Sequence, residues 1–165
     1  MDLETVLFWL FAGLTLAGGV SVVVSRNPVH AAMGLVGAFF ALAGLYLLLL
    51  AQLLAALQIL VYAGAIMVLF LFVIMLLNLS PKELGERRVG PFKIVGGLTA
   101  AGLTALLVGL LAPLRPAAHT PVSDFGTVAA VGRLIFNEYT LPFEATSLLL
   151  LAAMVGAVVV AKGKI

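Results

Sequence analysis

The stretch of this chain that decides its fold runs from Val29 to Leu77. It reads VHAAMGLVGAFFALAGLYLLLLAQLLAALQILVYAGAIMVLFLFVIMLL, and its 49 residues include no Asp, Glu, Lys or Arg. As a single α-helix it would be roughly 74 Å long, whereas the hydrocarbon core of a bilayer is about 30 Å thick. The stretch must therefore fold back on itself. Gln52, beside Ala51, is the polar break near its middle, and we expect a tight turn there.

Outward from this turn, the chain holds further apolar segments of about 20 residues, the length that crosses a bilayer as a helix. The sequence predicts an all-α membrane protein with five transmembrane helices in one transmembrane domain, 1–165. The predicted spans are 3–24, 29–50, 53–77, 92–114 and 141–161.

The composition excludes a soluble globular domain. Hydrophobic residues make up 64% of the chain and charged residues 10%, against about 25% charged in ordinary soluble domains. The longest predicted connection, 115–140, is shorter than the roughly 40 residues that an independent fold usually needs, so a nucleotide-binding or cofactor domain does not fit. With no cysteine, the chain offers no disulfide, thiolate metal site or iron–sulfur ligand. A net charge of +2 speaks against a nucleic-acid partner.

The distribution of Lys and Arg predicts the orientation, because cytoplasmic loops carry the excess of positive charge. We expect the N-terminus outside and the C-terminus in the cytoplasm. We also expect no cleaved signal peptide, since the first segment begins with Asp2 and Glu4 instead of basic residues. With five spans, the cytoplasmic side holds Arg26, Lys82, Arg87, Arg88, Lys93, Lys162 and Lys164, and the other side holds Arg115 and Arg133.

A short helix is predicted between the fourth and fifth spans, from 124 to 136, with Ser123 as its cap. Val128, Val131 and Ile135 would form one apolar face, which favours a position flat in the membrane interface. A simple connecting role is favoured over a dedicated binding role. Elsewhere, Asn27 and Pro28 are typical of a helix start, and Gly34 with Ala38 is typical of close helix packing.

Polar groups inside the third span are the main candidates for function. Gln58 and Tyr62 are four residues apart, so a regular α-helix places them on one face. Gly64 lies next to the middle of the span, where it would permit a π-bulge or a close contact. The residues alone leave two interpretations open: a packed helix whose polar groups bond to neighbours, or a functional polar path.

Glu144 is the carboxylate of the last span, three residues inside its predicted start. An interfacial position, stabilised by the helix dipole and by water, is favoured over a buried functional role. His30 and His119 fall on opposite sides of the membrane in the predicted topology. We therefore expect no metal and no haem in this chain.

Three segments of the sequence resemble one known family. They are 27–31 (NPVHA), 58–79 (QILVYAGAIMVLFLFVIMLLNL), and 132–144 with its GRLIF, Tyr139 and Phe143–Glu144. This pattern is similar to subunit J of the bacterial proton-pumping NADH–quinone oxidoreductase, respiratory complex I, whose mitochondrial counterpart is NADH dehydrogenase subunit 6. The resemblance covers essentially the whole chain. One position departs from it, since many members carry Glu where this chain has Gln58.

The resemblance implies a subunit of a proton-translocating NADH–quinone oxidoreductase in the bacterial inner (plasma) membrane. NADH, FMN, iron–sulfur clusters and quinone would be bound by other subunits, and this chain alone would carry no redox centre. Its partners would be lipid and other membrane-arm subunits, including the quinone-site and antiporter-like subunits.

The resemblance also implies a mechanism, in which the third helix switches between a π-bulged and a regular α form and couples quinone reduction to proton translocation. Gln58, Tyr62 and Gly64 would lie at the gate. The bulky side chains that the switch swings would be Met67, Phe70 and Phe72, and Glu144 is a further coupling candidate.

Two other functions are compatible with the residues. One is a subunit of a multisubunit cation/proton antiporter, which would lack flavin and iron–sulfur partners. The other is a purely structural scaffold of the membrane arm, for which conservative changes at Tyr62 or Gly64 would not affect turnover.

Overall fold

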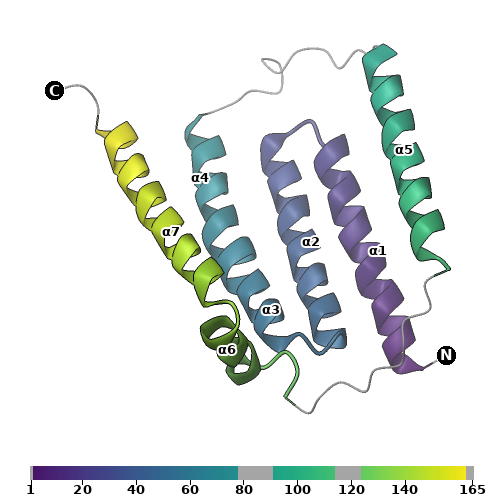
Figure 1. The fold of residues 1–165 in the computed structure, drawn as a ribbon. Coiled ribbons are helices and arrows are strands. Elements are labelled where there is room, and N and C mark those ends of the chain that lie inside the picture. Colours follow the sequence, from purple (N-terminus) through teal and green to yellow (C-terminus); the bar gives the residue numbers. More distant parts are fainter. Residues whose placement is uncertain (1, 78–90, 114–123, 163–165) are drawn as a thin grey trace.

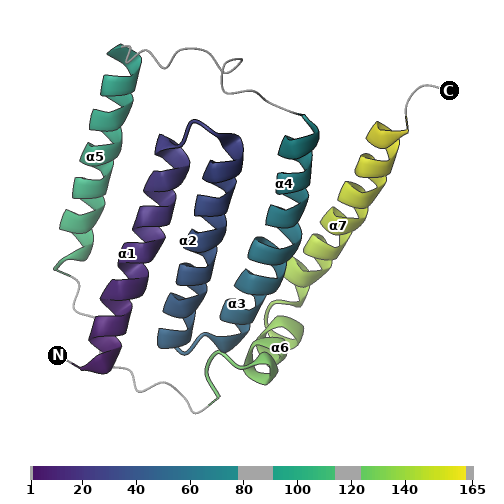
Figure 2. The ribbon, with the colours of Figure 1, turned by 180° about the vertical axis from the view of Figure 1, so that it is seen from behind.

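The computed structural model describes residues 2–77, 91–113 and 124–162, and every regular element in these ranges is helical. Figure 1 shows the arrangement, and Figure 2 shows it from behind. The elements are α1 (Leu3–Val24), α2 (Pro28–Leu48), α3 (Gln52–Leu57), η1 (Gln58–Ile66), α4 (Met67–Leu76), α5 (Pro91–Leu111), α6 (Val128–Asn137) and α7 (Thr140–Ala161). The prediction of an all-α chain is confirmed for this part of the molecule.

Four helices of the described chain are long and apolar enough to cross a membrane: α1, α2, the continuous helix Gln52–Leu76, and α7. This continuous helix is formed by α3, η1 and α4 together. The fourth predicted span, 92–114, corresponds to α5, which has 21 residues and ends at Leu111. At about 1.5 Å per residue, α5 is about 32 Å long.

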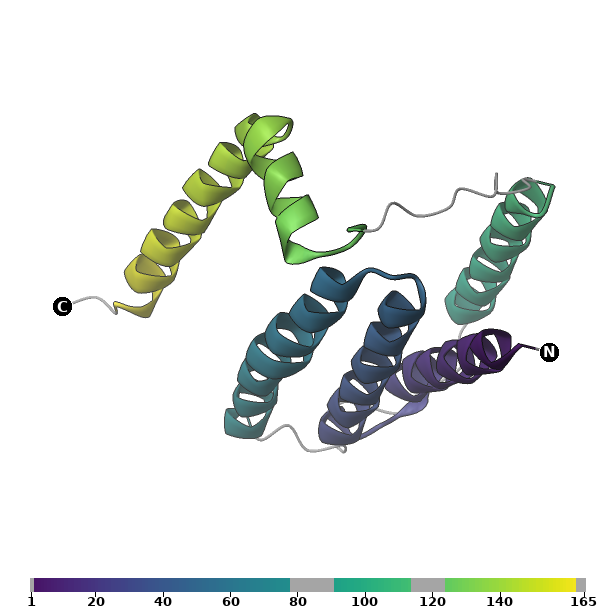
Figure 3. The same cartoon turned by 90° about the horizontal axis from the view of Figure 1, so that it is seen from below.

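Helix α2 is the centre of the packed part of the molecule. It lies between α1 on one side and the Gln52–Leu76 helix on the other, as Figure 3 shows from below. Helix α5 contacts no other described helix, and α7 contacts only α6. Neither α1 nor α7 has a buried residue. In lipid, an apolar face needs no protein cover, so these faces suit lipid or neighbouring subunits.

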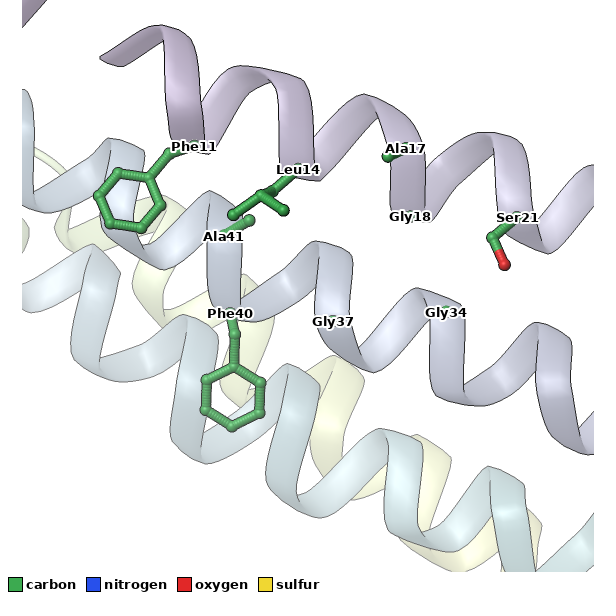
Figure 4. Close-up of a pocket in the computed structure, with 9 residues that line it drawn as sticks. All are labelled: Phe11, Leu14, Ala17, Gly18, Ser21, Gly34, Gly37, Phe40 and Ala41. Carbon is green, nitrogen blue, oxygen red and sulfur yellow. The ribbon is translucent and has the colours of Figure 1, made fainter. Parts of the chain in front are cut away.

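Small residues bring α1 and α2 together. A Cβ atom added at Gly18 would lie 2.8 Å from the Gly34 carbonyl oxygen and 2.8 Å from the Ala38 Cβ. The predicted close packing at Gly34 and Ala38 is thus confirmed. Beside this crossing lies an open groove of about 480 Å³ (Figure 4), lined by Phe11, Leu14, Ala17, Gly18, Ser21, Gly34, Gly37, Phe40 and Ala41.

The expected turn lies where the polar break predicted it. Helix α2 ends at Leu48, and Leu50 adopts a left-handed conformation with φ of 59°. The Ala51 amide donates to the Tyr46 carbonyl (2.9 Å) and the Leu50 amide to the Leu47 carbonyl (3.0 Å). These two bonds form a Schellman motif, which satisfies carbonyls at the end of α2 and reverses the chain within three residues.

The two predicted caps have different outcomes. The Asn27 side-chain oxygen accepts a hydrogen bond from the Val29 amide (2.9 Å), so the predicted start of α2 is confirmed. The prediction of a helix from 124 was wrong, because α6 begins at Val128 and is capped by Thr127. The positive φ of Gly126, 72°, is incompatible with a helix that continues through it. Ser123 lies outside the described residues. Helix α6 lies across the end of the bundle where α3 begins (Figures 1 and 3).

Candidate functional site

The third span contains a π-helix of nine residues, η1, from Gln58 to Ile66. At its end the Met67 amide donates to the Tyr62 carbonyl, five residues earlier, and also to the Gly64 carbonyl. A π-helix bonds residues five apart, and most examples are single-turn bulges that occur frequently at functional sites. Of the two features that Gly64 would permit, a π-bulge or a close contact, the structure has the π-helical distortion, and this extends over more than one turn.

Gly64 lies within η1 at a place where a side chain would be crowded. A Cβ atom built there would be 3.2 Å from the carbonyl oxygen of Ile59, which is five residues earlier in the same helix. No other described atom outside its own helix backbone approaches this point within 4 Å. The missing Cβ at Gly64 thus makes room for the distorted backbone of its own helix, and it is not needed for the approach of another helix.

The prediction that Gln58 and Tyr62 share a face was wrong. Gln58 is 5% exposed, whereas Tyr62 is 48% exposed. In the π conformation the residue above Gln58 is five positions later, and this is Ala63, which is 8% exposed. The four-residue spacing would hold only in a regular α-helix.

The buried side of the Gln52–Leu76 helix faces α2. Beyond η1, Met67 is 3% exposed and Ile74 is 8% exposed, and both pack with Ala32 of α2. Leu35, Val36, Phe39 and Leu71 surround this cluster. Among the described residues no fully buried side-chain nitrogen or oxygen lacks a hydrogen-bond partner. Each polar side-chain atom of Gln58 therefore either has a hydrogen-bond partner or keeps some accessible surface.

Aromatic side chains of the third span lie at the edge of this contact or outside it. The Tyr62 ring packs edge-on against Phe39 of α2, with ring centroids 5.8 Å apart and an interplanar angle of 67°. Phe70 and Phe72 are exposed. Of the bulky residues singled out in the sequence, only Met67 therefore lies inside the contact with α2.

Glu144 is not part of this site. It is an exposed residue in the first turns of α7, and α7 contacts only α6 among the described helices. The Ser147 hydroxyl donates to the Glu144 backbone carbonyl (2.6 Å), so this hydrogen bond does not involve the Glu144 carboxylate.

The site combines a distorted backbone with one buried amide and offers no ligand set. In residues 2–77, 91–113 and 124–162 there is no cluster of three or more His, Cys, Asp or Glu side chains that would hold a metal ion. The sequence reasoning missed Ala63 and Phe39, because their role depends on the π-helical register.

The apolar outer faces of this helical chain are exposed, which suits contact with lipid or with neighbouring membrane subunits. Residues 18–160 match the family described as NADH-ubiquinone/plastoquinone oxidoreductase chain 6. The chain belongs to this family, which includes subunit J of NADH-quinone oxidoreductase, and it is thus a membrane-arm subunit of a complex I-type enzyme. The family assignment made from segments 27–31, 58–79 and 132–144 is confirmed.

Individual relatives cover nearly the whole chain. It is 40% identical over 160 residues to NADH-quinone oxidoreductase subunit J of Rhodobacter capsulatus, which is 92% of this chain and 78% of that protein. It is 38% identical over 160 residues to NAD(P)H-quinone oxidoreductase chain 6 of Nostoc sp., covering 96% and 79%. It is 35% identical over 169 residues to F(420)H(2) dehydrogenase subunit J of Methanosarcina mazei, covering 98% and 93%.

Proposed function

We propose that this chain couples quinone reduction to proton translocation through a change of backbone register in η1. The observation that carries the proposal is the π-helix itself, which includes Gln58, Tyr62 and Gly64. A nine-residue π-helix is an uncommon state, and the same segment can form an α-helix if the residues beyond it rotate. Both states can be populated, and so can open or close a neighbouring path, only if their free energies differ by no more than a few kcal/mol.

The rotation has a defined result. Conversion of η1 to an α-helix shifts the face toward α2 by one residue, which is a rotation of about 100°. Ala63 and Met67 would leave α2, and Tyr62 and Ile66 would take their places. By the same one-residue shift, Phe70 would replace Leu71 and Val73 would replace Ile74.

This exchange changes the polarity beside α2. Tyr62 would move onto the face that holds Gln58, so that a hydroxyl and an amide lie one turn apart. In the π form that place is held by Ala63. A water path beside α2 would thus gain a polar group in one register and lose it in the other. Two of the exchanged pairs, Met67 with Ile66 and Ile74 with Val73, are similar in size, which limits the difference in packing energy at those positions.

The chain's partners are proposed to be the quinone-site and antiporter-like subunits of the membrane arm, in the inner (plasma) membrane of a bacterium. The exposed apolar faces of α1, α5 and α7 support such neighbours. The relatives' names specify different electron donors, NADH, NAD(P)H and F(420)H(2), for chains of similar sequence. This supports the view that other subunits bind the donor, FMN, the iron–sulfur clusters and quinone.

A complex purified through a tag on this chain should contain flavin and iron–sulfur clusters. Absorbance and electron paramagnetic resonance spectra of the complex, extracted gently from native membranes, measure both. A complex that contains antiporter-like subunits but neither prosthetic group would contradict the proposed function.

The proposed orientation places the α1–α2 turn in the cytoplasm and the start of α6 outside. The turn between α1 and α2, which contains Arg26, and the C-terminal end of α7 lie at one end of the bundle, and the start of α6, just after Phe125, lies at the other (Figures 1 and 2). The chain has no cysteine of its own. In intact cells, a membrane-impermeant thiol reagent should therefore label Phe125→Cys and not Arg26→Cys. Labelling of Arg26→Cys but not of Phe125→Cys would show that the chain has the opposite orientation.

Substitutions at Gln58 test the polar path. Gln58→Ala should lower coupled turnover by at most about fivefold, because one neutral hydrogen-bonding group, worth about 1 kcal/mol, is lost. Gln58→Glu should be tolerated if the amide lies beside water or a polar partner of the complex. Quinone-linked NADH oxidation and proton uptake in proteoliposomes measure both variants. If the Gln58→Glu complex fails to assemble, the side chain at position 58 has neither water nor a polar partner beside it.

A further inference from the structure

The turn that precedes α6 is bonded directly to the start of the helix that contains η1. The Gly126 carbonyl accepts a hydrogen bond from the Leu53 amide at 3.0 Å. Leu53 is in the first turn of α3, where amides have no carbonyl partner within their own helix. A residue more than seventy positions away in the sequence therefore satisfies one of the free amides at this helix end.

Only glycine fits at position 126. Its φ of 72° lies in the left-handed region, which is unfavourable for other residues. A Cβ atom there would overlap the Leu50 carbonyl oxygen and would lie 2.9 Å from the Ala51 Cα. These are backbone atoms of the α2–α3 turn, so no side-chain movement can relieve the overlap.

The segment around Gly126 is itself held by hydrogen bonds. The Thr127 hydroxyl donates to the Asp124 carbonyl (2.8 Å) and accepts from the Ala130 amide (3.2 Å). The Thr127 amide also donates to the Asp124 carbonyl (3.3 Å). Gly126 is thus part of a hydrogen-bonded turn at the N-terminus of α6.

The two ends of the Gln52–Leu76 helix are consequently held in different ways. The start of α3 is fixed by the Schellman motif of α2 and by the bond to Gly126. Within the described residues, α4 touches only α2 and η1, and its contact with α2 is made by apolar side chains. Packed apolar side chains can exchange neighbours, whereas a bonded helix end resists rotation.

We infer that Gly126 is a positioning residue that fixes the α3 end of the third span, so that a register change in η1 rotates α4 and leaves α3 in place. The inference rests on the proposed function, because it names the contact that holds α3 still while the proposed register change rotates α4. It also gives the turn before α6 a role beyond that of a connection between spans.

Two spin-label pairs in the intact complex test the direction of the motion. One pair, Met33 on α2 with Leu54 on α3, reports on the α3 end. The other, Leu47 on α2 with Leu69 on α4, reports on the α4 end. All four side chains are exposed in this chain, and genetically encoded spin-labelled amino acids avoid the cysteines of other subunits. Distances are measured by double electron–electron resonance in the resting complex and in the complex trapped during turnover with NADH and quinone.

The expected result is a shift of the Leu47–Leu69 distance with no shift of the Met33–Leu54 distance. Equal shifts in both pairs would overturn the role of Gly126 and leave the register change standing. No shift in either pair would overturn the proposed function, and this inference with it.

A substitution at Gly126 gives a second readout. Gly126→Ala should broaden the Met33–Leu54 distance distribution and should lower the number of protons pumped per electron by about two- to thirtyfold, a range typical of residues that modulate coupling. NADH oxidation by an artificial acceptor should not change. The matched control is Gly132→Ala in α6, where an added Cβ has no described atom within 4 Å. A narrow distribution and normal pumping in Gly126→Ala would overturn the inference, and the wild-type pairs remain decisive if this variant does not assemble.

Discussion

Deletion of Leu60 should give an assembled complex that has lost proton pumping. Gln58 and Met67 both lie on the buried side of the helix. To place them there, the π-helix uses one residue more between them than an α-helix would need. Removal of one residue would let η1 become α-helical while Gln58, Ala63 and Met67 still face α2. The Leu60 side chain is 69% exposed, so its loss removes little packing within this chain. The helix would keep the resting face and have no second register available.

We expect quinone-linked turnover and proton uptake to fall by at least about tenfold, which corresponds to a barrier raised by about 1.4 kcal/mol. NADH oxidation by an artificial acceptor should persist, because that reaction requires only the peripheral subunits. The control is Leu60→Ala, which removes the side chain and keeps the backbone count, and it should retain both activities. Normal pumping after the deletion would show that η1 works without a second register.

Gly64→Val should impair pumping with less effect on assembly. A Cβ at this position lies 3.2 Å from the Ile59 carbonyl oxygen, closer than ordinary contact, and a β-branched side chain also stiffens the helix. The crowding should shift the balance between the two backbone forms by about 1–3 kcal/mol, or roughly five- to hundredfold. Proton uptake in proteoliposomes and quinone-linked NADH oxidation should both decrease, and electron transfer to an artificial acceptor should remain.

Gly97→Val in α5 is the control for adding a valine to an apolar helix. A Cβ at Gly97 has no described atom within 4 Å, so any effect should appear in assembly with neighbouring subunits. An assembled Gly64→Val complex that pumps normally would contradict the switching role. The scaffold function would then be the better explanation of this chain.

The caps and turns of this chain show which local features the sequence predicts. Asn27 and Pro28 define the start of α2, because a side-chain acceptor and a fixed φ are local requirements. Ser123 was the wrong cap for α6, because Thr127 follows a glycine whose positive φ interrupts the helix. That φ in turn reflects contact with the α2–α3 turn, which no local pattern contains.

The sequence also predicts the candidate site only in part. Gly64 marked the place where the backbone is distorted, but the spacing of Gln58 and Tyr62 predicted the wrong shared face. The choice between Tyr62 and Ala63 depends on one extra residue in the helical repeat. In α4 every side chain is apolar, so periodicity cannot identify the face that packs against α2.

The sequence by itself determined that the chain is helical and membrane-embedded and that it reverses at Ala51 and Gln52. The reason is length, since 49 uncharged residues exceed what one crossing of a bilayer can hold. Only the tertiary structure decided the register of the third span and the contact of Gly126 with the α2–α3 turn. In lipid, apolar residues are favourable on every face of a helix, so the pattern of hydrophobicity does not specify which face is buried, and the close packing of backbones and side chains decides it instead.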